Sequence, residues 1–316
     1  MFNLINLIKL VILLLTIVIA AAYISFIERR ILALVQHRYG PNRVGPYGIL
    51  QVVADMIKIL FKEDWTPKFS NKYLFNIAPI MSFIYMLPIF IIVPITADIF
   101  LSRLDIGILL FLALSGISVY PIILASWASN NKYAILGAVR AVAQVISYEV
   151  FLGLSIMGVV VKSKSFNLVN IVESQQHLWN IIPQFLGFIN FFIASLAICH
   201  RHPFDHPESE QELVSGYHIE YSGIKFSLFF TGEYISMIAT STMMVIIFLG
   251  GGYGPLLSAY LWFIIKLIFC IMLFILIRAS LLRPKYDHII TFSWLVCLPT
   301  SLINLLVTTF VYLLNK

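Results

Sequence analysis

The stretch that decides the fold is IIPQFLGFINFFIASLAICHRHPFDHPESEQELVSGYHIEYSGIKFSLFFTGEYISMIATSTMMVIIF, residues 181–248. Two apolar runs, 181–199 and 226–248, enclose a polar loop over 200–225. About 20 apolar residues in a row are enough to cross a bilayer as a helix, so we predict two membrane helices joined by this loop. Five of the fifteen acidic residues of the chain lie within 205–220. No fold needs that cluster for stability, and we therefore expect function there.

The composition of the whole chain is that of a membrane protein. Of its 316 residues, 60% are hydrophobic and 11% are charged, whereas soluble domains have about 25% charged residues. A net charge of +6 would suggest a nucleic-acid partner in a soluble protein; here we interpret the cations as a signal of membrane orientation. The three cysteines match neither a disulfide framework nor a metal site.

Eight apolar runs are long enough to span a bilayer. Because their hydrophobicity is continuous rather than alternating, they predict helices and not barrel strands. We therefore expect an all-α polytopic membrane protein in which residues 1–316 form a single integral membrane domain. The expected spans are near 4–27, 75–96, 105–128, 142–161, 181–199, 226–248, 257–279 and 289–314.

Lysine and arginine are distributed unevenly between the two sides of these spans. Fifteen of the 21 lie in or beside the loops that follow spans 1, 3, 5 and 7. Positively charged loops stay on the cytoplasmic side, so these loops, the acidic one included, are predicted to be cytoplasmic. Both termini are then predicted to lie on the opposite, periplasmic side.

The first cytoplasmic loop, 28–74, contains a segment with helical periodicity. Between Tyr47 and Phe61, apolar residues recur at helical spacing, with Asp55 and Lys58 on the other side. The segment is too short and too polar to cross the membrane. We expect a cytoplasmic amphipathic helix at the membrane surface between spans 1 and 2, whose cations contact membrane lipid.

Three ionisable residues fall inside predicted spans. Glu149 and Glu233 each lie about eight residues into a span, roughly 12 Å deep at about 1.5 Å per residue, and Lys266 lies near the midplane. Such groups are costly in a bilayer and are usually functional. A shared polar interior that relays protons is the favoured interpretation, and a structural ion pair between Glu233 and Lys266 is the alternative.

The acidic loop allows two further interpretations. The first is a well-capped helix, with Pro207 at its first position, a cap at Asp205 or His206 and an end at Gly216. Its carboxylates would then lie near the helix N-terminus, where negative charge is stabilising. His200, His202 and His206, together with Asp205, resemble metal ligands, but no paired ligand motif completes a site. We predict no metal, and expect proton exchange instead because imidazole titrates near neutrality.

The chain resembles subunit 1 of the proton-pumping NADH:quinone oxidoreductase (respiratory complex I) over essentially its whole length. The matching motifs are long: ERRILALVQHRYGPNRVGPYG (28–48), ADMIKILFKED (54–64), SNNKYAILGAVRAVAQVISYEV (129–150), HRHPFDHPESEQELVSGYHIEYSG (200–223) and FILIRASLLRPKYD (274–287). The resemblance implies a membrane subunit that forms the quinone tunnel and the start of the proton path of a translocase converting NADH and quinone to NAD⁺ and quinol. It implies that this chain binds no cofactor, that FMN and the iron–sulfur clusters lie in partner subunits, and that its partners are hydrophilic and antiporter-like subunits.

The site residues expected from the charge pattern and from the resemblance fall into three groups. For proton relay they are Glu149, Glu208, Glu210, Glu212, Glu220 and Glu233. For quinone binding they are Arg29, Arg38, Asp55, Arg201, Phe204, Asp205 and Tyr217. For charged support they are Glu28, Arg140, Lys266, Arg278 and Arg283.

The chain also departs from the family pattern. Ile198 stands where many members have Glu, and the ICHRHPFD form resembles a bacterial variant, so a bacterial inner membrane is expected rather than a mitochondrial one. The nearest alternative function is the equivalent subunit of a membrane-bound hydrogenase, which the first-loop and EYSG motifs disfavour. A stand-alone ion transporter, which would show inverted repeats, and a purely structural anchor are further alternatives.

Overall fold

The computed structural model describes residues 4–94, 102–255 and 257–314, without the side chains of residues 4–7, 210 and 211. Among these residues every regular element is a helix and there is no strand. The prediction of an all-α polytopic membrane protein is therefore confirmed. The last two residues of the expected span 75–96 lie outside the described residues.

Within the part of the chain that the structure describes, seven helical segments are long and apolar enough to cross a membrane. They are α1 (Leu4–Val35), α3 with α4 (Lys72–Ile84, Ile89–Ile92), α5 with α6 (Gly107–Ile117, Val119–Ser129), α7 (Lys132–Ser163), α11 (Gly223–Phe248), α12 (Ala259–Ser280) and α13 to α14 (Tyr286–Phe292, Leu298–Leu314). The expected span 181–199 is represented by α9 (Phe185–Ile198), which is apolar but only 14 residues long.

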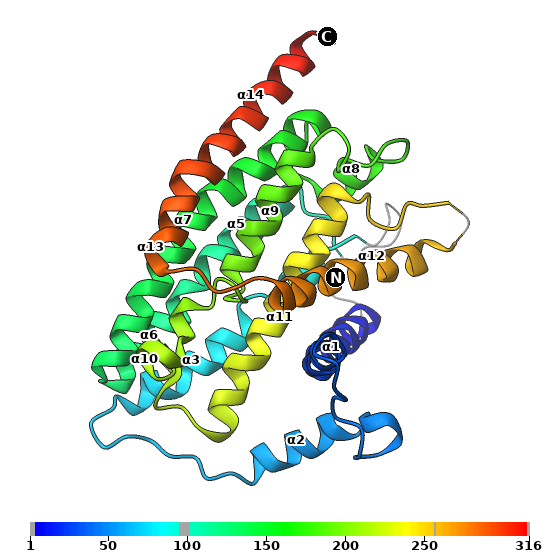
Figure 1. Cartoon of the computed structure of the whole chain (residues 1–316). Coiled ribbons are helices and arrows are strands. Elements are labelled where there is room, and N and C mark those ends of the chain that lie inside the picture. The colour runs from blue at the N-terminus through cyan, green and yellow to red at the C-terminus, as the bar shows by residue number, and fades with distance from the viewer. Residues whose placement is uncertain (1–3, 95–101, 256, 315–316) are drawn as a thin grey trace.

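The helices pack around α11, which is buried along most of its length. Figure 1 shows α7, α9 and α14 running side by side, and these three helices contact one another. On its other sides α11 contacts α3, α12 and α1, and α1 and α12 run at a steep angle to the main bundle in Figure 1. The interior is closed by aromatic contacts such as Phe191 with Phe248, whose ring centroids are 5.5 Å apart. Side chains reaching inward from α1, α11 and α12 therefore meet.

Two helices extend well beyond the predicted spans. α1 runs to Val35 although its apolar run stops near residue 27, and α7 starts at Lys132 rather than near 142. The side-chain oxygen of Asn131 accepts a hydrogen bond from the backbone N–H of Tyr133 at 3.0 Å and so caps α7. Hydropathy marks where a helix leaves apolar surroundings, not where its backbone hydrogen bonds end. Glu28 and Arg140, expected in loops, consequently lie on helices.

The amphipathic helix expected between Tyr47 and Phe61 is present as α2 (Gln51–Leu60). Its residue Val52 is buried against Ala22 and Phe26 of α1. A short helical turn, η1 (Pro46–Gly48), leads into it. The helix α8 (Leu168–Glu173) lies in the segment between α7 and α9, and η4 (Ser293–Cys297) joins α13 to α14.

The acidic loop does not form the single capped helix that its sequence allows. It consists of a 3-10 turn η2 (His206–Glu208), one α-helical turn α10 (Glu210–Leu213) and a second 3-10 turn η3 (Gly216–His218). The side chain of Asp205 does not cap η2. Gly216 has φ +62°, and a Cβ there would lie 1.7 Å from the carbonyl oxygen of Pro207. The loop therefore folds back on itself at a contact that only glycine permits.

Candidate functional site

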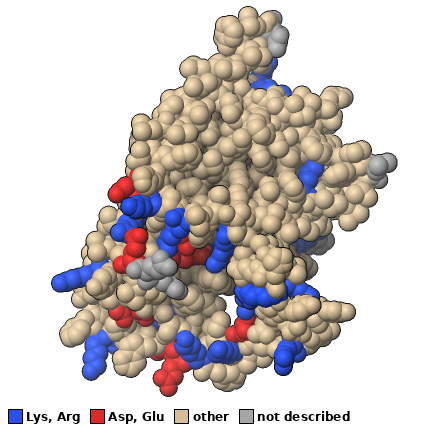
Figure 2. All heavy atoms as spheres, viewed as in Figure 1, with Lys and Arg blue, Asp and Glu red and all other residues tan. Residues whose placement is uncertain are grey.

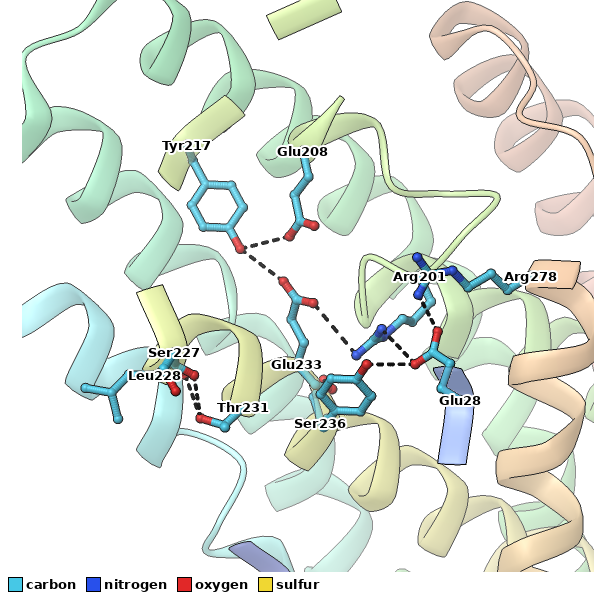
Figure 3. Close-up of polar contacts among 11 residues, drawn as sticks. Glu28, Arg201, Glu208, Tyr217, Ser227, Leu228, Thr231, Glu233, Ser236 and Arg278 are labelled. Atoms are coloured by element: carbon cyan, nitrogen blue, oxygen red, sulfur yellow. Dashed lines mark hydrogen bonds and ion pairs between the residues drawn. The ribbon is translucent and has the colours of Figure 1, made fainter. Parts of the chain in front are cut away.

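Six polar side chains from five segments of the chain form one continuous line of contacts in the interior (Figure 3). They come from α1, α11, α12, the turn that follows α9 and the acidic loop. Successive members touch through hydrogen bonds or ion pairs. We call this line the acid–arginine chain, and in order it consists of Glu208, Tyr217, Glu233, Arg201, Glu28 and Arg278.

Tyr217 connects the two carboxyl groups at one end of the chain. Its Oη lies 3.1 Å from Oε1 of Glu208 and 3.2 Å from Oε1 of Glu233. A phenol has one proton to donate, so Tyr217 donates to one carboxylate and accepts from the other only if that carboxyl is protonated. Burial and the two nearby carboxylates raise the pKa of Tyr217 well above its ordinary value. The phenol thus keeps its proton, and the geometry favours one proton shared between the two acids.

Glu208 is the ionised member of this pair. Burial opposes its ionisation, but the neighbouring Glu233 and the electrostatic effect of His218, His200 and Arg201 outweigh burial and lower the pKa of Glu208. Because the lowered pKa keeps Glu208 ionised, the shared proton is held by Glu233. Two buried carboxyls this close would repel each other if both were ionised.

Glu28 is the meeting point of the cations at the other end. Its Oε2 lies 3.4 Å from Nη1 of Arg201 and accepts a hydrogen bond from Oη of Tyr234 at 2.8 Å, while its Oε1 binds Nη1 of Arg278. The guanidinium carbon of Arg201 lies 4.0 Å from the centre of the Tyr234 ring, and its Nη2 lies 3.9 Å from Oε2 of Glu233. The ionisable charges of the acid–arginine chain are three carboxyls and two guanidiniums. With one proton on Glu233, its net charge is zero.

Two large cavities adjoin the acid–arginine chain. The first, of about 520 Å³ and within the roughly 300–1,000 Å³ of small-molecule sites, lies between α1, α2 and α11 and reaches Glu28. The second, of about 400 Å³ and also within that range, is lined by Glu208, Tyr217 and Glu233. Phe226, Phe230 and Arg278 line both cavities. The two spaces thus share walls, with one on the α1–α2 side and the other at the carboxyl pair.

The residues predicted for quinone binding are not all brought together. Arg29 and Asp55 form an exposed ion pair, 2.8 Å between Nη2 and Oδ2, at the wall of the first cavity. Arg38 lies on the exposed loop after α1, with its Nε 2.8 Å from Oε1 of Gln36, and lines neither cavity. Phe204 is buried and packs edge-on against Tyr148.

Other predicted residues form separate pairs around the site. Asp205 lines the second cavity and binds Arg283, with 3.2 Å between Oδ1 and Nε. On the outer part of the loop, Glu212 pairs with Arg140 of α7. The side-chain oxygen of Glu220 accepts a hydrogen bond from Asn131 at 2.8 Å. These contacts fix the loop to α7 and to the segment before α13.

Besides Glu212 and Glu220, two more of the predicted relay acids lie outside the acid–arginine chain. Glu149 is half-buried on α7, and a Cβ at Gly116 of α5 would lie 2.7 Å from its Oε1. No hydrogen bond or ion pair joins the Glu149 carboxylate to another described side chain. Glu210 begins α10, but its side chain lies outside the described part of the structure.

Lys266 does not pair with Glu233, so the alternative of a structural ion pair between them is wrong. Its Nζ donates to the carbonyl oxygens of Leu249, Gly251 and Tyr253, at 2.6, 3.0 and 2.6 Å, and lies 4.1 Å from the centre of the Trp179 ring. The glycine-rich turn after α11 leaves these carbonyls without helical partners, and the ammonium satisfies them.

Sequence reasoning missed two features of this site. Tyr234, which holds Glu28, directly follows Glu233 in the sequence, and a phenol beside a buried acid is the signal that identifies it. Phe226 and Phe230 recur at a spacing of four on α11, but so do many apolar residues of a membrane helix, so only the cavities distinguish them. Among the described residues no group of three or more His, Cys, Asp or Glu is placed to hold a metal ion.

A comparison with protein families matches the sequence of this chain to a known group. A family model described as NADH dehydrogenase covers residues 8–309, nearly the whole chain. The match includes every member of the acid–arginine chain and the walls of both cavities, and it confirms the resemblance of the sequence motifs. The chain therefore belongs to the NADH dehydrogenase family of complex I subunit 1, as a membrane protein that assembles with the other subunits of that complex.

Proposed function

We propose that this chain provides the membrane part of the path by which quinone reaches its reduction site, and the first groups of the proton path. The observation that carries the proposal is the pair of cavities with shared walls. One begins between α1 and α2, and the other ends at the carboxyl pair bridged by Tyr217. A molecule in the first cavity is thus next to the cationic end of the acid–arginine chain.

The first cavity suits a quinone with an apolar tail. Its wall surface is mainly apolar and comes largely from α1, α2 and α11, and the amphipathic character of α2 supports an opening at the membrane surface. The charged groups on the wall are the pair of Arg29 with Asp55, Arg278 beside Glu28, and the two lysines Lys58 and Lys62. A wall surface that is mainly apolar and carries charged groups accommodates an apolar tail and orients a polar headgroup.

The charge of the quinone would act on the proton shared by Glu208 and Glu233. A negative charge near Arg278 competes with Glu28 for the cations that bind it. Two unit charges 4 Å apart interact with an energy of about 4 kcal/mol at an effective dielectric constant of 20. Arg201 contacts both Glu28 and Glu233, so a change in the charge around Glu28 alters the hold of Arg201 on Glu233. Glu149, Glu210, Glu212 and Glu220 remain proposed members of the path beyond this chain.

Electrons reach the quinone from outside this subunit. We propose that FMN and the iron–sulfur clusters lie in hydrophilic partner subunits, that antiporter-like membrane subunits receive the protons, and that this chain binds no redox group. Figure 2 shows the charged side chains gathered over the end of the molecule that carries α2 and α10. This distribution supports placing that end at the cytoplasm of a bacterial inner membrane.

The test uses the assembled enzyme in membrane vesicles with Glu233→Gln and Glu208→Gln, and exposed Glu63→Gln as the matched control. Each carboxyl variant removes one site of the shared proton but keeps a hydrogen-bonding amide. We expect electron transfer from NADH to a water-soluble acceptor to be unchanged, and quinone-linked proton pumping to fall at least tenfold, as for loss of an acid–base group. Pumping at the parental rate in both carboxyl variants would sink the proposal.

A further inference from the structure

The first cavity carries two lysines that the acid–arginine chain does not use. Lys58 lies in the last turn of α2, and Lys62 follows four residues later, just beyond the end of the helix, so the two lie on one side of it. Both are exposed and both line the cavity, which places them where the cavity meets its surroundings. Among the described residues, neither ammonium has a hydrogen bond, an ion pair or a ring contact.

The other charged groups of this cavity are already paired. Asp55 binds Arg29, with 2.8 Å between Oδ2 and Nη2. Glu28 binds Arg278. Four cations and two carboxylates line the cavity, and each carboxylate has its own arginine. The excess positive charge therefore belongs to the two lysines, and an uncharged quinone has no group that compensates it.

The outer side of α2 is apolar and uncovered. Val53, Ile57 and Leu60 are 45%, 50% and 62% exposed and recur at helical spacing on the side of α2 opposite the two lysines. In Figure 1, α2 lies at the margin of the molecule. An amphipathic helix with an uncovered apolar side lies in the membrane interface. This position brings the lysines on its other side to the level of the phospholipid headgroups.

Behind the lysines the cavity is mainly apolar. Its volume is about 520 Å³, and its wall includes Val52, Phe226 and Phe230. A lysine ammonium is a compact charge that binds phosphate, and basic pockets between membrane helices bind lipid headgroups. Two lysines in front of an apolar cavity therefore match a molecule that has a phosphate at one end and an acyl chain at the other.

We propose that an anionic phospholipid binds here, with its phosphate at Lys58 and Lys62 and one acyl chain in the first cavity. The phosphate compensates the excess positive charge, and the chain covers the apolar wall. A zwitterionic phospholipid fits less well, because its own cation balances its phosphate. A chain in the cavity excludes a quinone tail from the same space. The lipid site goes beyond the proposed function, and only the competition with quinone rests on it.

The test uses the assembled enzyme in phosphatidylcholine vesicles with a trace of phosphatidylglycerol that carries a photoactivatable group at the end of one acyl chain. We expect this probe to label the peptides of α2 and α11 that line the cavity. Each lysine should contribute about fivefold, so Lys58→Gln/Lys62→Gln should lower the labelling roughly 25-fold. The control Lys68→Gln/Lys72→Gln removes the same charge from exposed lysines that line neither cavity. It should label within about twofold of the parent, because salt screens charges that are far from the headgroup.

Three results would overturn the lipid site. Equal losses in the two double variants would show a general attraction to the membrane surface. Equal labelling by a photoactivatable phosphatidylcholine would remove the anionic headgroup, and displacement of the probe by inorganic phosphate at constant ionic strength would assign the lysines to free phosphate. Electron transfer from NADH to a water-soluble acceptor reports assembly. Should Lys58→Gln/Lys62→Gln not assemble, Ser227→Trp fills the cavity without a change of charge, and undiminished labelling of α11 in that variant overturns the entry of the chain.

An excess of long-tailed quinone separates this inference from the proposed function. Quinone should displace the probe, since both need the first cavity. Labelling that depends on the lysines but resists quinone would leave the lipid site in place and contradict the quinone path. Labelling that does not depend on the lysines overturns the lipid site whatever quinone does.

Discussion

Removing the carboxylate of Glu28 should destabilise this protein far more than removing the cation it binds at the surface. Glu28→Gln leaves Arg201, whose side chain is 7% exposed, without its main partner. Loss of one partner of a buried ion pair costs about 3–5 kcal/mol. Arg201 keeps the ring of Tyr234 at 4.0 Å and Glu233 at 3.9 Å. We therefore expect the low end, about 3 kcal/mol.

Arg278→Gln removes the other half of the same contact and serves as the comparison. The side chain of Arg278 is 42% exposed, so solvent screens the pair, and such pairs contribute about 1 kcal/mol or less. Glu28 keeps Arg201 and Tyr234 in this variant. The difference between the variants is then about 2 kcal/mol, a factor of roughly 30 if it appears in the unfolding rate.

The assay is irreversible thermal inactivation of the assembled enzyme in mild detergent, with electron transfer from NADH to quinone as the readout. Each variant is normalised to its own starting activity, so that an effect on catalysis does not enter the rate. Glu28→Gln should inactivate roughly 30 times faster than Arg278→Gln, because the barrier carries the lost contact. Rates within about threefold of each other would refute the assignment of Glu28 as the buried centre of the cationic end.

Three further predictions test other parts of the structure. Ser227→Trp places a large side chain in the first cavity and should raise KM for long-tailed quinones more than for short ones. The control Thr309→Trp, on the half-buried surface of α14, should not have this effect. Equal effects of the two variants would contradict a path for the quinone tail through the first cavity. Lys266→Met should lower the thermal stability of the assembled enzyme by about 2–3 kcal/mol because three carbonyls lose their donor, with the initial quinone reduction rate unchanged. The pKa of Glu212 is held below its ordinary 4.5 by the hydrogen bond and charge of Arg140, so this half-exposed pair stabilises by about 1 kcal/mol or less above that pH. In thermal inactivation, the loss of stability caused by Arg140→Gln should disappear as the pH falls through the pKa of Glu212, because the protonated acid no longer attracts the arginine. A loss of stability that grows in acid would contradict this pairing.

Apolar run length predicts where helices cross the bilayer, but not where they begin and end. The expected helix positions agree with α1, α3, α5 to α7 and α11 to α14 because a bilayer needs about 20 apolar residues of helix. Run length places Glu28 in a loop since the apolar residues stop near residue 27, yet backbone hydrogen bonds continue to Val35. Placing Glu28 in a loop has a functional consequence. The sequence then predicts Glu28 as a supporting charge, whereas the structure shows it as the carboxylate that contacts Arg201, Arg278 and Tyr234.

Lys266 illustrates a second limit of sequence reasoning. Its position along the span suggests a depth near Glu233 and hence an ion pair. The side chain instead reaches the carbonyls of the turn after α11. A lysine side chain extends several ångströms from its backbone and binds where unpaired acceptors lie, and the open carbonyls of residues 249–253 are not visible as a charge in the sequence.

The acidic loop shows why counting carboxylates does not locate a site. Of its five acids, Glu208 alone among those with described side chains joins the acid–arginine chain, while Glu212 and Glu220 bind residues on or next to α7. What selects Glu208 is the close approach of Gly216 to Pro207, which returns the chain so that Tyr217 reaches it. The acids alone would form a solvated helix with favourable N-terminal charges. The backbone reversal brings a phenol, and through it Glu233, against one of them, and this makes the cluster a place for a shared proton.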